Sequence, residues 1–268
     1  DVMSLVSDLG IENYHLVGHS LGGGIAWETL LKDFKRAKSM TLINPASPYG
    51  FGGTKDEEGK LTYSDGAGSG GGLANPELIP WVNTEFQSET LTQRLKNSVD
   101  IFYWKSENAP ANVEELLEGV LSMKQGEQFY PGDSVSSANF PFVAPGKYGQ
   151  LNAAAPITKI GIGKQIVSIP KKVPIWWVRG DEDQIVSDQS QFDMATHGAN
   201  GLISDYPGEV ECPPQPMVGQ TRAVLKAYAL EGGFYQESVY ENCGHSPHIE
   251  FPEKFSKELN EWISNIHE

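Results

Sequence analysis

Apolar residues recur along this chain with two different periods, which predict strands and helices in turn. Apolar or alternating runs of strand length lie at residues 14–17, 39–43, 173–178 and 237–240. Helical spacing of apolar residues lies at residues 2–9, 217–230 and 252–267. Short buried strands separated by helices are typical of a parallel sheet. The pattern therefore predicts an α/β fold with a mostly parallel sheet flanked by helices.

The chain between the strands predicted at residues 39–43 and 173–178 is far too long for a simple crossover. It contains two helical patterns, formed by Leu91, Leu95, Val99 and Phe102 and by Val113, Leu116, Leu117, Val120 and Leu121. We therefore expect a core part at residues 1–47, a largely helical cap inserted at residues 48–170, and a second core part at residues 171–268.

Two other segments are rich in glycine or proline. The glycine cluster at residues 66–72 does not follow a predicted strand. It is therefore expected to be a flexible or tightly turned loop rather than a phosphate cradle. Residues 206–216 have the composition of an extended loop, which we expect to border the mouth of a site.

Composition narrows the function classes. The chain has 268 residues, of which 39% are hydrophobic, so it can bury a substantial core. No apolar run is long enough for a membrane span, and a net charge of −15 argues against nucleic acid or anionic membranes as partners. Cys212 and Cys243 are too few for a disulfide framework and have no zinc-site spacing. We expect no metal or cofactor, and a reducing compartment, the cytoplasm, is favoured.

The most informative motif is Gly18-His19-Ser20-Leu21-Gly22, which stands between a predicted strand and a predicted helix. A serine on such a tight turn is held in a strained conformation and pushed out of the surface. Gly18 and Gly22 are expected to leave room for the strand and helix to approach each other. Ser20 is therefore the candidate nucleophile, and it needs a base and an acid further along the chain.

Candidate partners follow later strands. Asp181, Glu182 and Asp183 follow the strand at 173–178, and His245 and His248 lie in the loop after the strand at 237–240. With this order of motifs, the chain resembles the α/β-hydrolase superfamily, in particular its serine esterases with a helical cap. The resemblance spans the chain and selects Asp183, three positions after a glycine, and His245, which follows a glycine directly.

The resemblance implies a mechanism. Ser20 attacks a carbonyl carbon, His245 takes the serine proton, and Asp183 orients the imidazole and stabilises its charge. The backbone N–H of Leu21 is one oxyanion donor. In the family the second donor comes from a loop that precedes the nucleophile, and only residues 1–19 do so here. We therefore expect a missing N-terminal segment, or a second polypeptide, to supply that donor and complete the sheet beside residues 14–17.

The substrate expected is a small carboxylic ester with an apolar or aromatic group, since aromatic residues are frequent in the insertion. Candidate substrate-binding residues are His19, Trp104, Phe140 and Phe142. Lactone, amide and carbon-carbon bond hydrolysis, and an aminopeptidase, remain open because they use the same triad. So does a binding or receptor protein on the same scaffold with little turnover.

Overall fold

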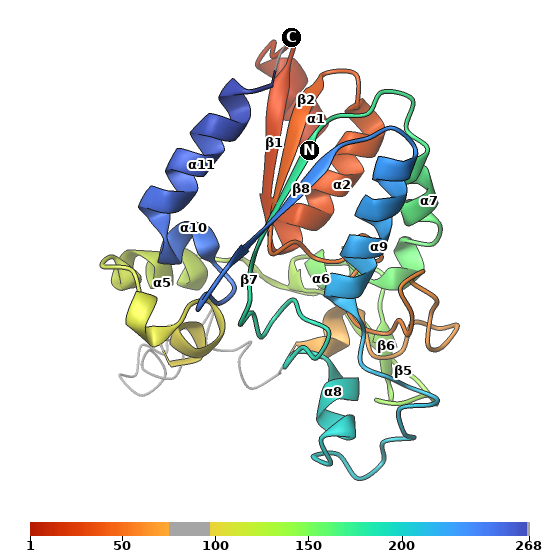
Figure 1. Ribbon diagram of the computed structural model, residues 1–268. Helices are drawn as coiled ribbons and strands as arrows, with labels where there is room; N and C mark the ends of the chain where they lie inside the picture. Colours follow the sequence, from red (N-terminus) through yellow and green to blue (C-terminus); the bar gives the residue numbers. More distant parts are fainter. Residues whose placement is uncertain (75–96, 267–268) are drawn as a thin grey trace.

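A computed structural model describes residues 1–74 and 97–266, and its centre is a parallel sheet (Figure 1). The sheet has four strands in the order β1-β2-β7-β8. Their bounds are Tyr14–His19 for β1, Ala37–Ile43 for β2, Ile175–Gly180 for β7 and Tyr235–Tyr240 for β8. Each neighbouring pair is parallel, as the apolar runs predicted.

Alternation along β7 divides the core into two layers. Ile175 and Trp177 pack into the larger cluster, whereas Trp176 and Val178 pack into the smaller cluster on the opposite face of the sheet. All four of these side chains are buried, which is why this strand has a continuous apolar sequence.

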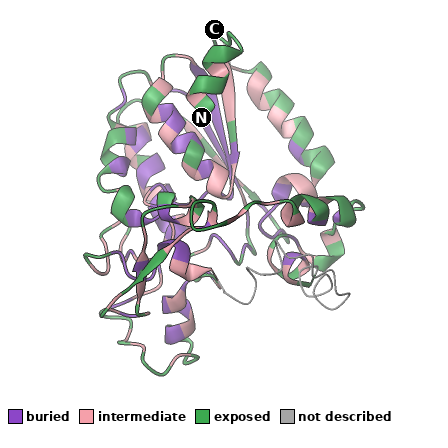
Figure 2. Ribbon diagram, turned by 180° about the vertical axis from the view of Figure 1, so that it is seen from behind, coloured by how far each residue is buried: buried purple, intermediate pink, exposed green. Residues whose placement is uncertain are grey.

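Helices cover both faces of the sheet. Helices α2 (Leu21–Asp33), α7 (Ile162–Val167) and α9 (Met217–Leu230) contribute to the larger cluster, and α11 (Pro252–Ser264) contributes Phe255 to the smaller one. Figure 2 shows buried residues gathered in the sheet and on the helices of the larger cluster, whereas α11 is mostly intermediate or exposed. Helix α9 has its predicted bounds, and α11 ends at Ser264 rather than at His267.

The N-terminal corner is largely exposed. Helix α1 (Val2–Asp8) has no buried residue, and Leu5 is 59% exposed. Strand β1 pairs only with β2 among the described residues, and Val17 is 50% exposed. Within residues 1–74 and 97–266, no helix has both the length and the apolar character that crossing a membrane requires.

The segment between β2 and β7 is built from short elements. Most of them lie at the carboxyl ends of the strands, whereas α7 lies beside α9 along one face of the sheet (Figure 1). In chain order they are η1 (Gly70–Leu73), a helical stretch at 97–102, η2 (Ser106–Asn108), α5 (Val113–Leu121), β3 (Gln125–Gly126), β4 (Tyr130–Pro131), β5 (Ser134–Ser136), β6 (Val143–Pro145), α6 (Gln150–Ala153), η3 (Pro156–Thr158) and α7. Helix α5 was predicted. Of the other helical pattern, Leu91 and Leu95 lie outside the described residues.

The end of this segment packs with the core. Ile162 and Ile166 of α7 are buried in the cluster that also contains Trp27 of α2 and Leu225 of α9. The residues just before position 170 thus pack with the core, and the predicted division of the chain into core and cap stays a prediction.

The glycine cluster is a tightly packed turn. A side chain at Gly70 would meet Asn152 Oδ1 at 2.4 Å, and one at Gly71 would meet the Asp133 carbonyl oxygen at 2.5 Å. The Gly71 N–H donates to Asn152 Oδ1 at 2.8 Å. Of the two predicted alternatives, the turned loop is therefore the one observed.

The β1–α2 turn depends on glycine at two positions, one of which differs from the prediction. A Cβ atom at Gly18 would lie 2.5 Å from the Gly22 carbonyl oxygen, and one at Gly23 would lie 2.4 Å from Pro45 Cβ. At Gly22 a Cβ atom would meet nothing within 4 Å. Close approach therefore requires Gly18 and Gly23, and Gly22 is not needed for it.

We expect Gly18→Ala to destabilise the protein by about 2 kcal/mol or more, because the methyl group meets rigid backbone. The matched variant Gly22→Ala should leave the free energy of unfolding unchanged or raise it by up to about 1 kcal/mol, because alanine favours helix. Urea unfolding of both variants measures the difference. Equal destabilisation by the two substitutions would contradict this account of the turn.

Candidate active site

Ser20 stands between β1 and α2 in a conformation that few side chains adopt. Its φ is 55° and its ψ is −124°. Its carbonyl oxygen accepts hydrogen bonds from the N–H groups of Gly23 at 2.9 Å and Ala46 at 2.8 Å, and its own N–H donates to Ile43 at 3.0 Å. These three bonds hold the strained backbone in place. Strain at a non-glycine residue is a frequent feature of functional sites, and the sequence motif predicted it here.

His245 and Asp183 meet where the chain leaves β8 and β7. His245 Nδ1 donates to Asp183 Oδ2 at 2.9 Å, and both side chains are buried. Asp183 Oδ1 accepts from the N–H groups of Ile185 at 2.8 Å and Val186 at 3.1 Å. Because a carboxylate oxygen can only accept, an imidazole in its neutral form has its proton on Nδ1 here and a lone pair at Nε2.

That lone pair has no partner. His245 is fully buried, and no hydrogen-bond partner of its Nε2 lies among the described residues. Ser20 is the neighbour of His19, whose Nε2 donates to the His245 carbonyl oxygen at 2.9 Å and whose ring centroid lies 4.7 Å from that of His245. Ser20 and His245 thus lie in the same region of the molecule, and no hydrogen bond joins their side chains.

Positive charge is disfavoured on two further histidines that lie beside His245, chiefly because they are buried. Burial, followed by the proximity of His245 and His248, lowers the pKa of His19 to about 3. Burial and His245 lower the pKa of His248 to about 4. Both rings are therefore neutral near pH 7. The ring of His248 contacts the rings of His19 and Phe255.

Asp181 and Glu182, the rejected candidates for the acid, have other contacts. Asp181 Oδ1 accepts from the Cys243 N–H at 3.2 Å, and Glu182 Oε2 accepts from Lys105 Nζ at 2.7 Å. Both residues are exposed. Of the three carboxylates in this loop, Asp183 is the one within hydrogen-bond distance of His245.

Two polar residues that the sequence did not single out support the loop after β8 that carries His245, which we call the histidine loop. Asn44, at the end of β2, donates from Nδ2 to the Gly244 carbonyl oxygen at 3.0 Å and accepts from the Gly180 N–H at 3.2 Å. Glu250 accepts from the Gly244 N–H at 2.8 Å. Both side chains are buried. No local signal distinguishes them from exposed polar residues, although Glu250 belongs to the Glu-Phe-Pro stretch after the histidine loop.

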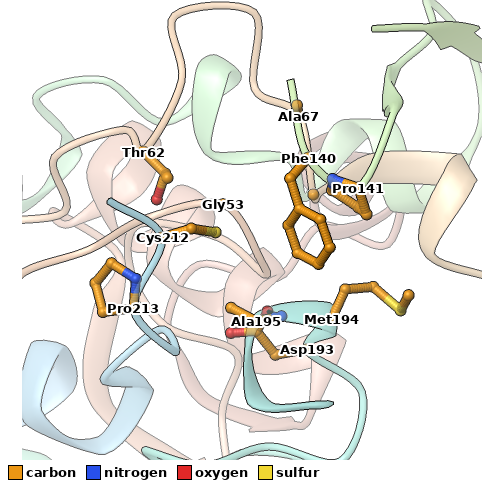
Figure 3. A pocket seen from close by; sticks show the side chains of 11 residues that line it. Gly53, Thr62, Ala67, Phe140, Pro141, Asp193, Met194, Ala195, Cys212 and Pro213 are labelled. Carbon is orange, nitrogen blue, oxygen red and sulfur yellow. Dashed lines mark hydrogen bonds between the residues drawn. The ribbon is translucent and has the colours of Figure 1, made fainter. Parts of the chain in front are cut away.

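The predicted substrate-binding residues are not all together. His19 touches His245, whereas the Trp104 indole is buried against α5 residues and donates to Asp100 Oδ1 at 3.0 Å. Phe140 is buried and lines a small pocket with Asp193, Met194 and other residues (Figure 3). None of the candidate catalytic residues lines that pocket. Phe142 is 51% exposed.

A comparison with protein families supplies the identification. Residues 2–199 match the model of the alpha/beta hydrolase fold family. The chain belongs to the α/β-hydrolase family. Membership of this family fixes the fold, and the reaction has to be argued from the site.

Similar proteins include several hydrolases. Over 55 residues the chain is 47% identical to the pancreatic triacylglycerol lipase of Mus musculus, a match that spans 20% of this chain and 12% of the lipase. The structure of esterase RhEst1 from Rhodococcus sp. ECU1013 is 12% identical, with a TM-score of 0.48, covering 100% of this chain and 71% of that one. The meta-cleavage product hydrolase CumD from Pseudomonas fluorescens IP01 is 16% identical, with a TM-score of 0.46, covering 99% and 70%. The family assignment rests on the family model alone.

The lowered pKa values of His19 and His248 predict a pH-dependent stability. Between pH 6.5, the ordinary histidine pKa, and about 4, the unfolded chain binds protons that the folded chain excludes. The free energy of unfolding should therefore fall as the pH falls through 6.5, and the contribution of these two residues to its slope should become small above about pH 7.5.

Urea unfolding at about pH 7.5, 6.5 and 5 tests this, because most carboxylates are still ionised at pH 5. The double variant His19→Gln and His248→Gln should have a flatter profile between pH 6.5 and 5 than the unaltered protein. Identical profiles would show that these histidines bind protons equally in both states.

Proposed function

We propose that this protein is a serine hydrolase that cleaves a carboxylic ester through an acyl-enzyme, with Ser20 as nucleophile, His245 as base and Asp183 as the acid that orients it. The observation that carries the proposal is the buried, unpartnered Nε2 of His245. An unsatisfied buried nitrogen is costly and needs an explanation. A base that awaits the proton of a neighbouring serine provides one.

The reaction would proceed in two steps. Ser20 Oγ attacks the ester carbonyl carbon while its proton passes to His245 Nε2, and the alcohol then leaves with that proton. A water molecule attacks the acyl-enzyme, again giving its proton to Nε2, and Ser20 Oγ leaves and recovers the proton as the carboxylic acid departs. The bond from Nδ1 to Asp183 keeps the imidazole in the required tautomer and stabilises its charged form.

The negative oxygen that develops during attack needs donors. Leu21 is the first residue of α2, so its N–H has no acceptor within the helix and lies at the positive end of the helix dipole. We propose this N–H as one oxyanion donor. For the second donor we propose a polypeptide segment that pairs with β1 on the side away from β2, where no strand of the described residues lies. The half-exposed Val17 on that strand supports this proposal.

Substitution of the proposed triad should distinguish Asp183 from Asp181 in the loop after β7, which we call the acid loop. Ser20→Ala and His245→Ala should each lower the rate of labelling by a fluorophosphonate probe by at least about 1,000-fold, and Asp183→Asn should lower it strongly through the wrong tautomer. Asp181→Asn is the matched control, because Asp181 does not contact the imidazole, and it should keep most of the rate. Rapid labelling of Ser20→Ala would remove the nucleophile assignment, and equal losses at Asp181 and Asp183 would remove the choice of acid.

Turnover distinguishes the ester hydrolase from its alternatives. We expect p-nitrophenyl esters to be hydrolysed with a burst of nitrophenol, because the acyl-enzyme forms before water releases it. The substrates to compare are p-nitrophenyl esters of increasing chain length, the corresponding anilides and a lactone. Labelling at Ser20 without turnover of any of them would favour a binding protein on this scaffold over an ester hydrolase.

A further inference from the structure

The carboxylate of Glu250 joins the histidine loop to the inserted segment. Glu250 Oε1 accepts from the N–H groups on both sides of His245, those of Gly244 at 2.8 Å and Ser246 at 3.4 Å. Glu250 Oε2 accepts from the Lys105 N–H at 3.1 Å and from Asn108 Nδ2 at 3.4 Å. One oxygen therefore faces the histidine loop, and the other faces residues 105–108.

These contacts require an acceptor at both oxygens. The remaining contact, from Cys243 Sγ to Oε1 at 3.4 Å, is also that of a donor. Among the described residues no cationic side chain lies within ion-pair distance of Glu250, although the residue is only 7% exposed. A buried carboxylate without a counter-ion is costly unless its hydrogen bonds offset the loss of water. The donors that this carboxylate accepts from therefore have to offset that loss.

Residues 105–108, which we call the clasp segment, also bridge the two loops of the proposed triad. Lys105 Nζ donates to Glu182 Oε2 in the acid loop at 2.7 Å and to Asn242 Oδ1 in the histidine loop at 2.6 Å. Asn108 Nδ2 donates to the Asn242 carbonyl oxygen at 2.9 Å. The clasp segment thus spans the loops that carry Asp183 and His245.

Packing leaves little freedom between these parts. A Cβ atom at Gly244 would lie 3.2 Å from Glu250 Oε1 and 3.4 Å from the backbone of Trp104, the residue before the clasp segment. The Tyr103 ring meets the His245 ring edge to face, with 5.8 Å between centroids. A displacement of the clasp segment would therefore be transmitted to the backbone of His245.

We propose that Glu250 is a positioning residue, which couples the clasp segment to His245 so that the imidazole is held ready for Ser20 when the inserted segment is docked. This inference rests on the proposed function and names the group through which the insertion acts on it. Glu250 does not touch substrate. It acts by fixing the peptide bonds on both sides of the base.

Glu250→Gln tests the proposal with almost no change of shape. Glutamine has one acceptor oxygen and one NH₂ group, so its amide must face donors either in the histidine loop or in the clasp segment. Loss of the hydrogen bonds to either the histidine loop or the clasp segment should lower kcat and kcat/KM for a p-nitrophenyl ester by the same factor, about 10- to 100-fold, with KM unchanged. Glu253→Gln, an exposed position in the first turn of α11, is the matched control and should behave like the unaltered protein.

A second variant acts from the other side. Asn108→Asp places a carboxylate against Glu250 Oε2 and the Asn242 carbonyl oxygen, so it should push the clasp segment away and lower kcat in the same manner. A proton NMR signal of the His245 Nδ1–H should move in both variants and stay in place in Glu253→Gln. This signal is a readout that a purely structural role of Glu250 would not shift.

The outcomes are distinguishable from failure of the proposed function. Ser20→Ala and His245→Ala report on the triad, whatever Glu250 does. If both abolish turnover while Glu250→Gln keeps kcat within about twofold, the positioning role is overturned and the hydrolase stands. An effect of Glu250→Gln on the unfolding midpoint alone also overturns it. Should Glu250→Gln fail to fold, an unchanged kcat in Asn108→Asp overturns the proposal.

Discussion

The hydrogen bond between Asp183 and His245 is the interaction on which the rest of the site depends. It joins the loops after two neighbouring parallel strands, and both side chains are buried. The carboxylate is itself held by two backbone N–H groups, so it cannot turn away without leaving them unpaired. This bond fixes the tautomer of His245. The resulting lone pair at Nε2 is the group that we propose as the base for Ser20.

The inserted segments are tied to the core by buried polar side chains as well as by apolar contacts. Gln215 Nε2 and Ser47 Oγ both donate to Gln220 Oε1, at 2.8 Å and 2.6 Å, and Gln220 Nε2 donates to Thr54 Oγ1 at 2.8 Å. Such a network is stable only when its members are satisfied together. This network holds the start of the segment between β2 and β7 against α9, while Glu250 holds the clasp segment against the histidine loop. The insertion is thereby fixed to α9 at one place and to the histidine loop at the other.

Sequence predicted what depends on local pattern and order. The four strands follow from apolar runs, the turn at Ser20 follows from its motif, and the pairing of Asp183 with His245 follows from a resemblance in the order of motifs. Contacts between distant segments could not be read in this way. Gly22 fits the motif, yet Gly23 is the residue that meets Pro45. Phe140 is aromatic and lies in the insertion, yet it lines a pocket formed with α8 (Met194–Ala199). One oxygen of the buried Glu250 carboxylate accepts from Lys105 and Asn108, more than a hundred positions away.

The central claim is that His245 Nε2 is the base for Ser20. A crystal structure of the protein after reaction with a fluorophosphonate tests it most directly. The account predicts a bond from phosphorus to Ser20 Oγ, with His245 Nε2 within about 3 Å of that oxygen or of a phosphonyl oxygen. Phosphorus on another residue, or an imidazole whose Nε2 is bound to a different protein group, would contradict it.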